Sequence, residues 1–144
     1  MSSESDDPLS SSGGDAGAGA AGAGGARRRV LIVDDEEDIR DALGAVFAME
    51  GFDVTLAESA ARALDQARDT AFDLVLTDLR MPGMGGAEML TQLVKIDPGV
   101  PIIVITGYVS DETAQDCLRR GARDCLRKPF ALDALLATVT RVLA

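Results

Sequence analysis

From residue 29 onwards, short apolar runs alternate with segments in which apolar residues recur every three or four positions. The recurring segments have the spacing of amphipathic helices, as in the last one, which carries Leu132, Leu135 and Val139 on one face. Five strands alternating with five helices predict an α/β domain built on a parallel sheet. The predicted strands lie at residues 29–33, 53–57, 73–78, 101–107 and 123–128.

The predicted strands differ in how apolar they are. The first, third and fourth are apolar along their whole length, which is typical of strands buried on both faces in the middle of a sheet. The second and fifth are half polar and fit the edges. With right-handed crossovers, this ranking predicts the strand order 2-1-3-4-5 of a doubly wound, flavodoxin-like sheet.

Residues at the predicted helix ends support this division. Gly51 follows the first helix and stops it. Ser110 stands where it can cap the fourth helix, which has Arg119 and Arg120 in its last turn and Gly121 beyond. The basic side chains at that end complement the helix dipole.

The first 27 residues have a different composition. They consist mainly of Ser, Gly, Ala and Asp and offer almost nothing to bury, so we predict a disordered tail over residues 1–27 and one folded domain over residues 28–144. The chain lacks the pattern of a signal peptide and any apolar run long enough to span a membrane. We therefore expect a cytoplasmic protein whose two cysteines, Cys117 and Cys125, are reduced thiols.

The charge of the chain narrows the possible functions. The formal net charge is −10, which disfavours direct binding to nucleic acid and to anionic membranes. Histidine is absent, which removes the commonest general base and the commonest zinc ligand.

Polar side chains follow the buried strands at their carboxyl ends, where ligands bind in sheets of this kind. The first strand leads into Asp34 and Asp35, the third into Asp78, the fourth into Thr106 and the fifth into Lys128. Carboxylates that converge in this way repel one another unless a cation lies among them. A few carboxylates completed by water suit Mg²⁺, which we therefore expect as the cofactor.

Each of these residues also has a simpler interpretation. Asp34 or Asp35 alone could cap the first helix, and Asp78 could open a turn. Thr106 could be an ordinary strand residue, and Lys128 an exposed lysine. The joint placement of all five at the carboxyl ends of four strands favours a site.

The motifs VDDEED, LTDLRMPGMGG, VITG and GARDCLRKPF resemble those of response-regulator receiver domains from two-component signal transduction, including single-domain receivers with the fold of the chemotaxis regulator. The resemblance runs from about Arg28 to Ala144. It implies a phosphorylation switch that accepts a phosphoryl group from a histidine kinase or a phosphotransfer protein. It also implies a phosphoacceptor with self-catalysed phosphorylation and dephosphorylation rather than an enzyme.

The resemblance assigns roles to individual residues. It makes Asp78 the phosphoacceptor and has Mg²⁺ held by Asp35, by Asp78 and by the backbone carbonyl of Arg80, with Asp34 acting through water. Phosphoryl transfer needs positioning and charge stabilisation rather than a strong base, so a site without histidine is adequate.

The remaining implied roles concern the phosphoryl group. Lys128 pairs with its oxygens, Thr106 turns inward to hydrogen-bond it, and the small Gly107 leaves room for it. The resemblance also implies a cis peptide bond between Lys128 and Pro129.

One position departs from the family pattern. Three residues before the lysine, receivers usually have a tyrosine or phenylalanine that swings inward on activation, and this chain has Cys125. The only tyrosine, Tyr108, follows Thr106 by two positions and is a candidate to cover the site. In the family, the positions of Arg80 and Tyr108 flank the approach of water to the phosphoryl group.

Three other functions fit parts of the sequence. An aspartyl-phosphate phosphatase of the haloacid dehalogenase type needs a second carboxylate where this chain has Arg80, and a flavin module is disfavoured by an aromatic content of 3%. A receiver-like adaptor that binds partners without phosphorylation is kept open by Cys125. For a phosphorylation switch, we expect output through protein contacts on the face made by the fourth helix, the fifth strand and the fifth helix.

Overall fold

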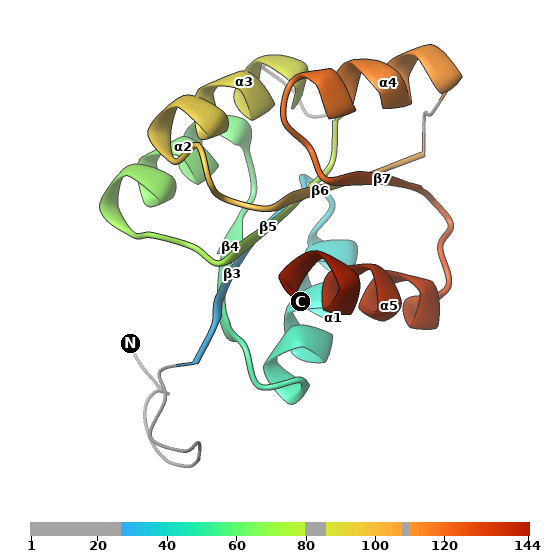
Figure 1. Cartoon of the computed structure of the whole chain (residues 1–144). Coiled ribbons are helices and arrows are strands. Elements are labelled where there is room, and N and C mark those ends of the chain that lie inside the picture. The colour runs from blue at the N-terminus through green and yellow to red at the C-terminus, as the bar shows by residue number, and fades with distance from the viewer. Residues whose placement is uncertain (1–26, 80–85, 108–109) are drawn as a thin grey trace.

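A computed structural model describes residues 27–79, 86–107 and 110–144, and these contain five strands and five helices in alternation (Figure 1). The strands are β3 (Arg29–Val33), β4 (Asp53–Ala57), β5 (Leu74–Thr77), β6 (Ile102–Thr106) and β7 (Asp124–Arg127). The helices are α1 (Glu37–Met49), α2 (Ala60–Asp69), α3 (Gly86–Ile96), α4 (Asp111–Arg119) and α5 (Leu132–Leu143).

All neighbouring strands pair in parallel, in the order β4-β3-β5-β6-β7. Numbered along the chain, this is the order 2-1-3-4-5, so the predicted topology is confirmed. The burial follows the predicted ranking as well. The strands β5 and β6 are buried throughout and β3 in all but its first residue, whereas β4 and β7 at the edges are only partly buried.

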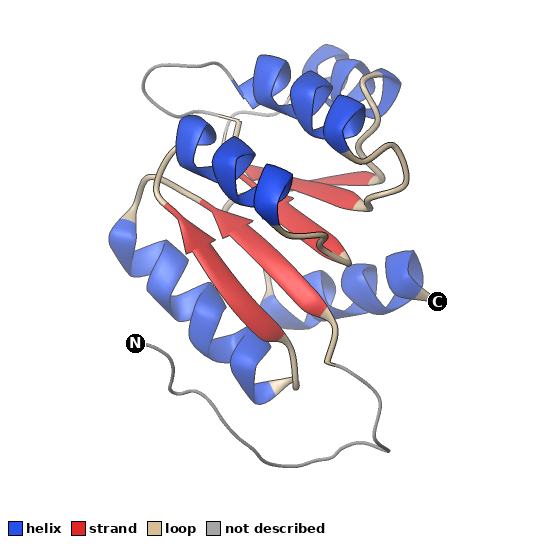
Figure 2. Cartoon of the chain, turned by 90° about the vertical axis from the view of Figure 1, so that its left-hand side faces the viewer, coloured by secondary structure: helices blue, strands red, loops and turns tan. Residues whose placement is uncertain are grey.

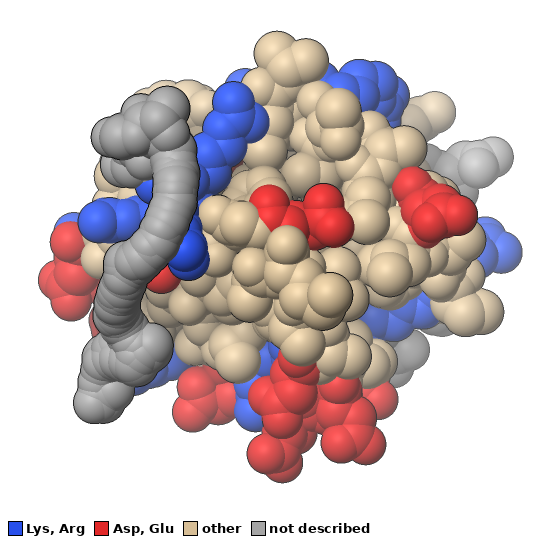
Figure 3. Space-filling view, turned by 90° about the horizontal axis from the view of Figure 1, so that it is seen from below, with Lys and Arg blue, Asp and Glu red and all other residues tan. Residues whose placement is uncertain are grey.

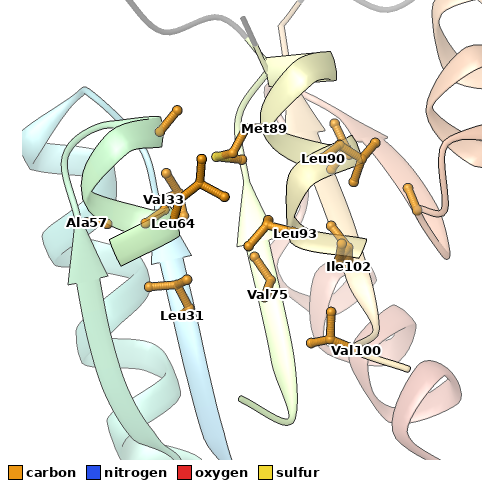
Figure 4. Packing of buried hydrophobic residues seen from close by; sticks show 14 of the residues in the cluster. Leu31, Val33, Ala57, Leu64, Val75, Met89, Leu90, Leu93, Val100 and Ile102 are labelled. Atoms are coloured by element: carbon orange, nitrogen blue, oxygen red, sulfur yellow. The ribbon is translucent and has the colours of Figure 1, made fainter. Parts of the chain in front are cut away.

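The helices cover both faces of the sheet (Figures 1 and 2). One apolar cluster joins α2, α3 and α4 to the sheet, and a second joins α1 and α5 to its other face. Successive residues of a strand point to opposite faces, so in β3 Leu31 belongs to the first cluster and Ile32 to the second. Figure 4 shows the first cluster, with Met89, Leu90 and Leu93 of α3 directed at the sheet.

Hydrogen bonds define the helix ends. The hydroxyl of Ser110 accepts a bond of 3.1 Å from the backbone N–H of Thr113, so the predicted cap of α4 is confirmed. The backbone N–H of Ala122 donates to the carbonyl of Cys117 at 3.0 Å and closes the other end of α4. Gly121, directly before Ala122, has a φ of 118°. Gly51, at the corresponding point after α1, has a φ of 93°. Backbone of this left-handed kind favours glycine.

The two glycines differ in the space around them, and this predicts different costs of substitution. A Cβ at residue 121 would lie 2.7 Å from Cγ2 of Val94, whereas one at residue 51 would meet nothing within 4 Å. We expect Gly51→Ala to lose about 1–2 kcal/mol of unfolding free energy through backbone strain alone. Gly121→Ala should lose about 1–3 kcal/mol more through overpacking against α3. Urea denaturation of both variants measures the difference, and equal losses would contradict the proposed clash.

Candidate functional site

Asp34, Asp78 and Lys128 are each held in place by a backbone hydrogen bond at the carboxyl edge of the sheet. The N–H of Asp34 donates to the carbonyl of Ala57 at 3.2 Å, and that of Asp78 to the carbonyl of Val33 at 3.1 Å. The N–H of Lys128 donates to the carbonyl of Thr106 at 2.9 Å. These bonds continue the strand pairing to the first residue beyond each strand. The backbone at these points is therefore as fixed as the sheet itself.

A lysine ammonium joins the carboxylates of two strands. Nζ of Lys128 lies 2.8 Å from Oδ2 of Asp78 and 3.0 Å from Oδ2 of Asp34, and donates a hydrogen bond to each. The two aspartates are 6% and 3% exposed, so water screens these contacts little. Their negative charges therefore depend on the lysine for compensation.

The environment also sets the proton affinity of the lysine. Burial acts against the charged ammonium, but the hydrogen bonds that Lys128 donates to Asp78 and Asp34 outweigh it, so the pKa of Lys128 is raised above its usual value. The ion pair therefore stabilises the folded protein fully below the ordinary lysine pKa of about 10.4. This contribution is lost as the pH rises through the higher pKa of the folded state.

Four carboxylates gather around this lysine. Asp34, Asp35, Glu36 and Asp78 each offer an oxygen atom, and these atoms all lie within 4.8 Å of one another. Asp35 and Glu36 are exposed, whereas Asp34 and Asp78 are buried. A set of hard oxygen donors that opens to solvent on one side fits Mg²⁺, which keeps several waters when protein-bound.

The turn between β3 and α1 excludes one of the simpler interpretations. The first helix is capped at Glu36, without a side-chain capping bond, so neither Asp34 nor Asp35 is its N-cap. Instead, Oδ1 of Asp34 accepts a hydrogen bond of 2.9 Å from the N–H of Glu36. The guanidinium of Arg40 donates to the carbonyl of Asp34, also at 2.9 Å. Asp34 is thus built into the turn through its side chain and its backbone.

The other candidate residues are placed as follows. Thr106 is fully buried at the end of β6, and a Cβ on Gly107 would be in ordinary contact with the stem of Lys128 at 3.9 Å. The peptide bond between Lys128 and Pro129 is cis, as expected. Arg80 and Tyr108 lie outside the described residues.

Cys125 lies on β7 and faces Cys117 of α4. Both are free thiols, and both belong to the apolar packing between α4 and the sheet. Burial raises the pKa of Cys125 to about 11, with Cys117 and Asp124 adding to the effect. Burial also raises the pKa of Cys117. The position that holds an aromatic ring in most receivers therefore carries a small protonated thiol here.

Glu36 is the site residue that sequence reasoning did not single out. Its oxygen Oε1 lies 3.6 Å from Nζ of Lys128. In the sequence, Glu36 is marked only by its position directly after the aspartate pair. It lies in a run of five acidic residues, and this run does not show which side chain turns towards the site.

Comparisons with known proteins identify the family of the chain. The model of the response regulator receiver domain family matches residues 30–140, and the chain belongs to that family. The transcriptional regulatory protein ZraR of Escherichia coli K12 is 44% identical over 94 residues, which are 65% of this chain and 21% of that protein. A response regulator receiver protein of Anaeromyxobacter sp. Fw109-5 is 44% identical over 99 residues, covering 69% of this chain and 42% of that protein. This chain thus spans less than half the length of these relatives.

Solved structures show the same fold. A CheY-like receiver domain protein from Methanospirillum hungatei superposes with a TM-score of 0.79 at 34% identity, over 82% of this chain and 94% of that one. NtrX of Brucella abortus superposes with a TM-score of 0.75 at 37% identity, over 80% of this chain and 26% of that one. The receiver fold predicted from the sequence is confirmed.

Removing the lysine should destabilise the metal-free protein. In EDTA, we expect Lys128→Met to lose about 3–5 kcal/mol of unfolding free energy, because two buried carboxylates are left without their partner. Mg²⁺ should restore part of this loss by binding the same carboxylates. The matched control is Lys95→Met on α3, where the lysine is exposed. Urea denaturation with and without Mg²⁺ measures both variants, and similar losses for both would contradict the role of the ion pair.

The thiols should react slowly in the folded protein. At pH 7.5 we expect Cys125 to react with a disulfide reagent on the order of a hundredfold more slowly than an unperturbed thiol, because its pKa of about 11 leaves little thiolate. Absorbance of the released thiolate measures the rate, with the urea-unfolded chain as the reference. The variant Cys117→Ser assigns the remaining signal to Cys125. Fast reaction of that variant in the folded state would show that the thiol is more open than the structure has it.

Proposed function

We propose that this chain is a phosphorylation-dependent switch of a two-component system that accepts a phosphoryl group on Asp78 from a histidine kinase or a phosphotransfer protein. The observation that carries the proposal is the bridge from Lys128 to Asp78 and Asp34, set among four carboxylates at the carboxyl edge of a parallel sheet. Membership of the receiver family supports it. Ligands of α/β proteins bind at this edge.

The carboxylates are the proposed ligands of Mg²⁺. Asp35 and Asp78 would bind it directly, together with the backbone carbonyl of Arg80, and Asp34 would bind it through water. When bound, the cation supplies positive charge against the oxygens of the phosphoryl group.

The chemistry follows from the placement of the side chains. A carboxylate oxygen of Asp78 attacks phosphorus in line, the bond from phosphorus to the donor atom breaks, and an acyl phosphate forms. Lys128 is already 2.8 Å from the attacking carboxylate and can move its charge to the phosphoryl oxygens. The hydroxyl of Thr106 donates to one of those oxygens in this proposal, and Gly107 leaves room beside Lys128. The same site then hydrolyses the acyl phosphate, so the chain is a self-modifying phosphoacceptor and not an enzyme acting on other molecules.

The proposed output is a protein contact on the face formed by α4, β7 and α5. Leu118 on α4 is 48% exposed and Leu132 on α5 is 42% exposed, so each offers apolar surface that a partner could cover. A receiver-like adaptor that works without phosphorylation remains the second candidate function. The observation that favours it is the partly buried thiol of Cys125 at the position of the usual aromatic switch residue.

The relatives bear on partners and location. ZraR is named as a transcriptional regulatory protein. A DNA-binding function would belong to a further domain, whereas for the residues described here we propose no direct contact with nucleic acid. The face seen in Figure 3 carries both acidic and basic side chains, with a group of acidic ones at its lower edge. None of the helices in the described ranges has the length and apolar character that a membrane span requires. The proposal keeps the cytoplasmic location expected from the sequence.

Phosphorylation with a small donor tests the proposal. Incubation with acetyl phosphate and Mg²⁺ should shift the wild-type protein in phosphate-affinity electrophoresis, and Asp78→Asn should abolish the shift because the nucleophile is gone. Asp65→Asn, the same change at an exposed aspartate of α2, should leave the shift intact. EDTA should also abolish it. A shift that persists in Asp78→Asn would rule out Asp78 as the phosphoacceptor, and its absence from every variant would favour the adaptor.

A further inference from the structure

Glu36 occupies an unusual position for a residue at the start of a helix. It is the N-cap of α1, yet its side chain makes no capping bond. The carboxylate instead belongs to the acidic cluster, with Oε1 at 3.6 Å from Nζ of Lys128. None of the roles proposed above for the metal ligands or the phosphoacceptor uses this side chain.

The neighbouring acidic residues behave differently. Glu37 and Asp38 lie in the first turn of α1, where negative charge is favourable to the helix dipole. Among the described residues, neither belongs to the group of carboxylates that could share a cation. Of these three consecutive acidic side chains, that of Glu36 is therefore directed at the site, whereas those of Glu37 and Asp38 interact favourably with the dipole of α1.

We propose that Glu36 is a fourth carboxylate of the phosphoacceptor site, which strengthens Mg²⁺ binding and slows the entry of small anionic phosphoryl donors. The inference rests on the proposed function, because it concerns the same cation and the same reaction. Glu36 acts as a positioning residue through its charge, on the metal and on Lys128.

The exposure of Glu36 determines how large its effect should be. Its side chain is 61% exposed, so water and salt screen the charge. A single negative charge several ångströms from a divalent cation at the protein surface changes binding by about three- to tenfold. This contribution should fall as salt is added, unlike that of the buried Asp34 and Asp78.

The effect on the phosphoryl donor has the opposite sign. Acetyl phosphate carries negative charge and must approach Lys128, which Glu36 helps to neutralise. Removing the charge of Glu36 reduces repulsion of the donor and leaves the ammonium with one carboxylate fewer. Weaker metal binding together with faster labelling at saturating Mg²⁺ is a combination that a general loss of structure would not produce.

The test compares Glu36→Gln with Glu37→Gln, two changes of equal size on adjacent residues. Isothermal titration with MgCl₂ at low salt should give a dissociation constant about three- to tenfold higher for Glu36→Gln. For Glu37→Gln we expect a change of less than about twofold. The difference in the Mg²⁺ dissociation constant between Glu36→Gln and the wild type should become smaller in 0.5 M KCl. At saturating Mg²⁺, acetyl phosphate should label Glu36→Gln faster than the wild type.

The outcomes separate this inference from the proposed function. Equal Mg²⁺ affinities for the wild type and Glu36→Gln would overturn the inference, as would unchanged or slower labelling at saturating Mg²⁺. The proposed function would survive either result as long as the wild type binds Mg²⁺ and is labelled on Asp78. A wild type that binds no Mg²⁺ and takes up no phosphoryl group would overturn both.

Discussion

The ammonium of Lys128, held between the buried carboxylates of Asp34 and Asp78, is the interaction on which the site depends. Two carboxylates that share a buried edge repel one another, and a counter-charge in contact with both makes their burial tolerable. The same contacts raise the pKa of the lysine, so it remains charged across the physiological range. The two buried carboxylates therefore have a counter-charge before any cation or phosphoryl group enters.

That interaction requires the parallel sheet. Lys128 and Asp34 are 94 positions apart in the chain, and they meet because β7 and β3 both end at the same edge. The backbone N–H groups of Asp34, Asp78 and Lys128 each donate to a carbonyl of an adjacent strand or its end. The three side chains therefore start from fixed points, and their separations need little further adjustment. This is the preorganisation that phosphoryl transfer demands.

Much of this was predictable from the sequence because burial leaves a clear pattern. The apolar runs of β3, β5 and β6 identified the middle of the sheet, and the half-polar β4 and β7 its edges. The polar residues at the carboxyl ends of four of the strands were then enough to locate the site. The orientation of individual side chains was not predictable. Glu36 turns towards Lys128 while Glu37 does not, and this depends on where the first turn of α1 begins, which an unbroken acidic run leaves undetermined.

The contacts of α4 show how the site is connected to the rest of the domain. Its last turn is tied to α3, because Arg120 donates to Thr91 at 3.0 Å and to Asp116 at 2.8 Å. The hydrogen bond from Arg120 lowers the pKa of Asp116, which keeps this link charged. Its first turn is capped by Ser110, four positions after Thr106. On the sheet side α4 meets the small thiol of Cys125, so the polar contacts described above lie at the two ends of the helix.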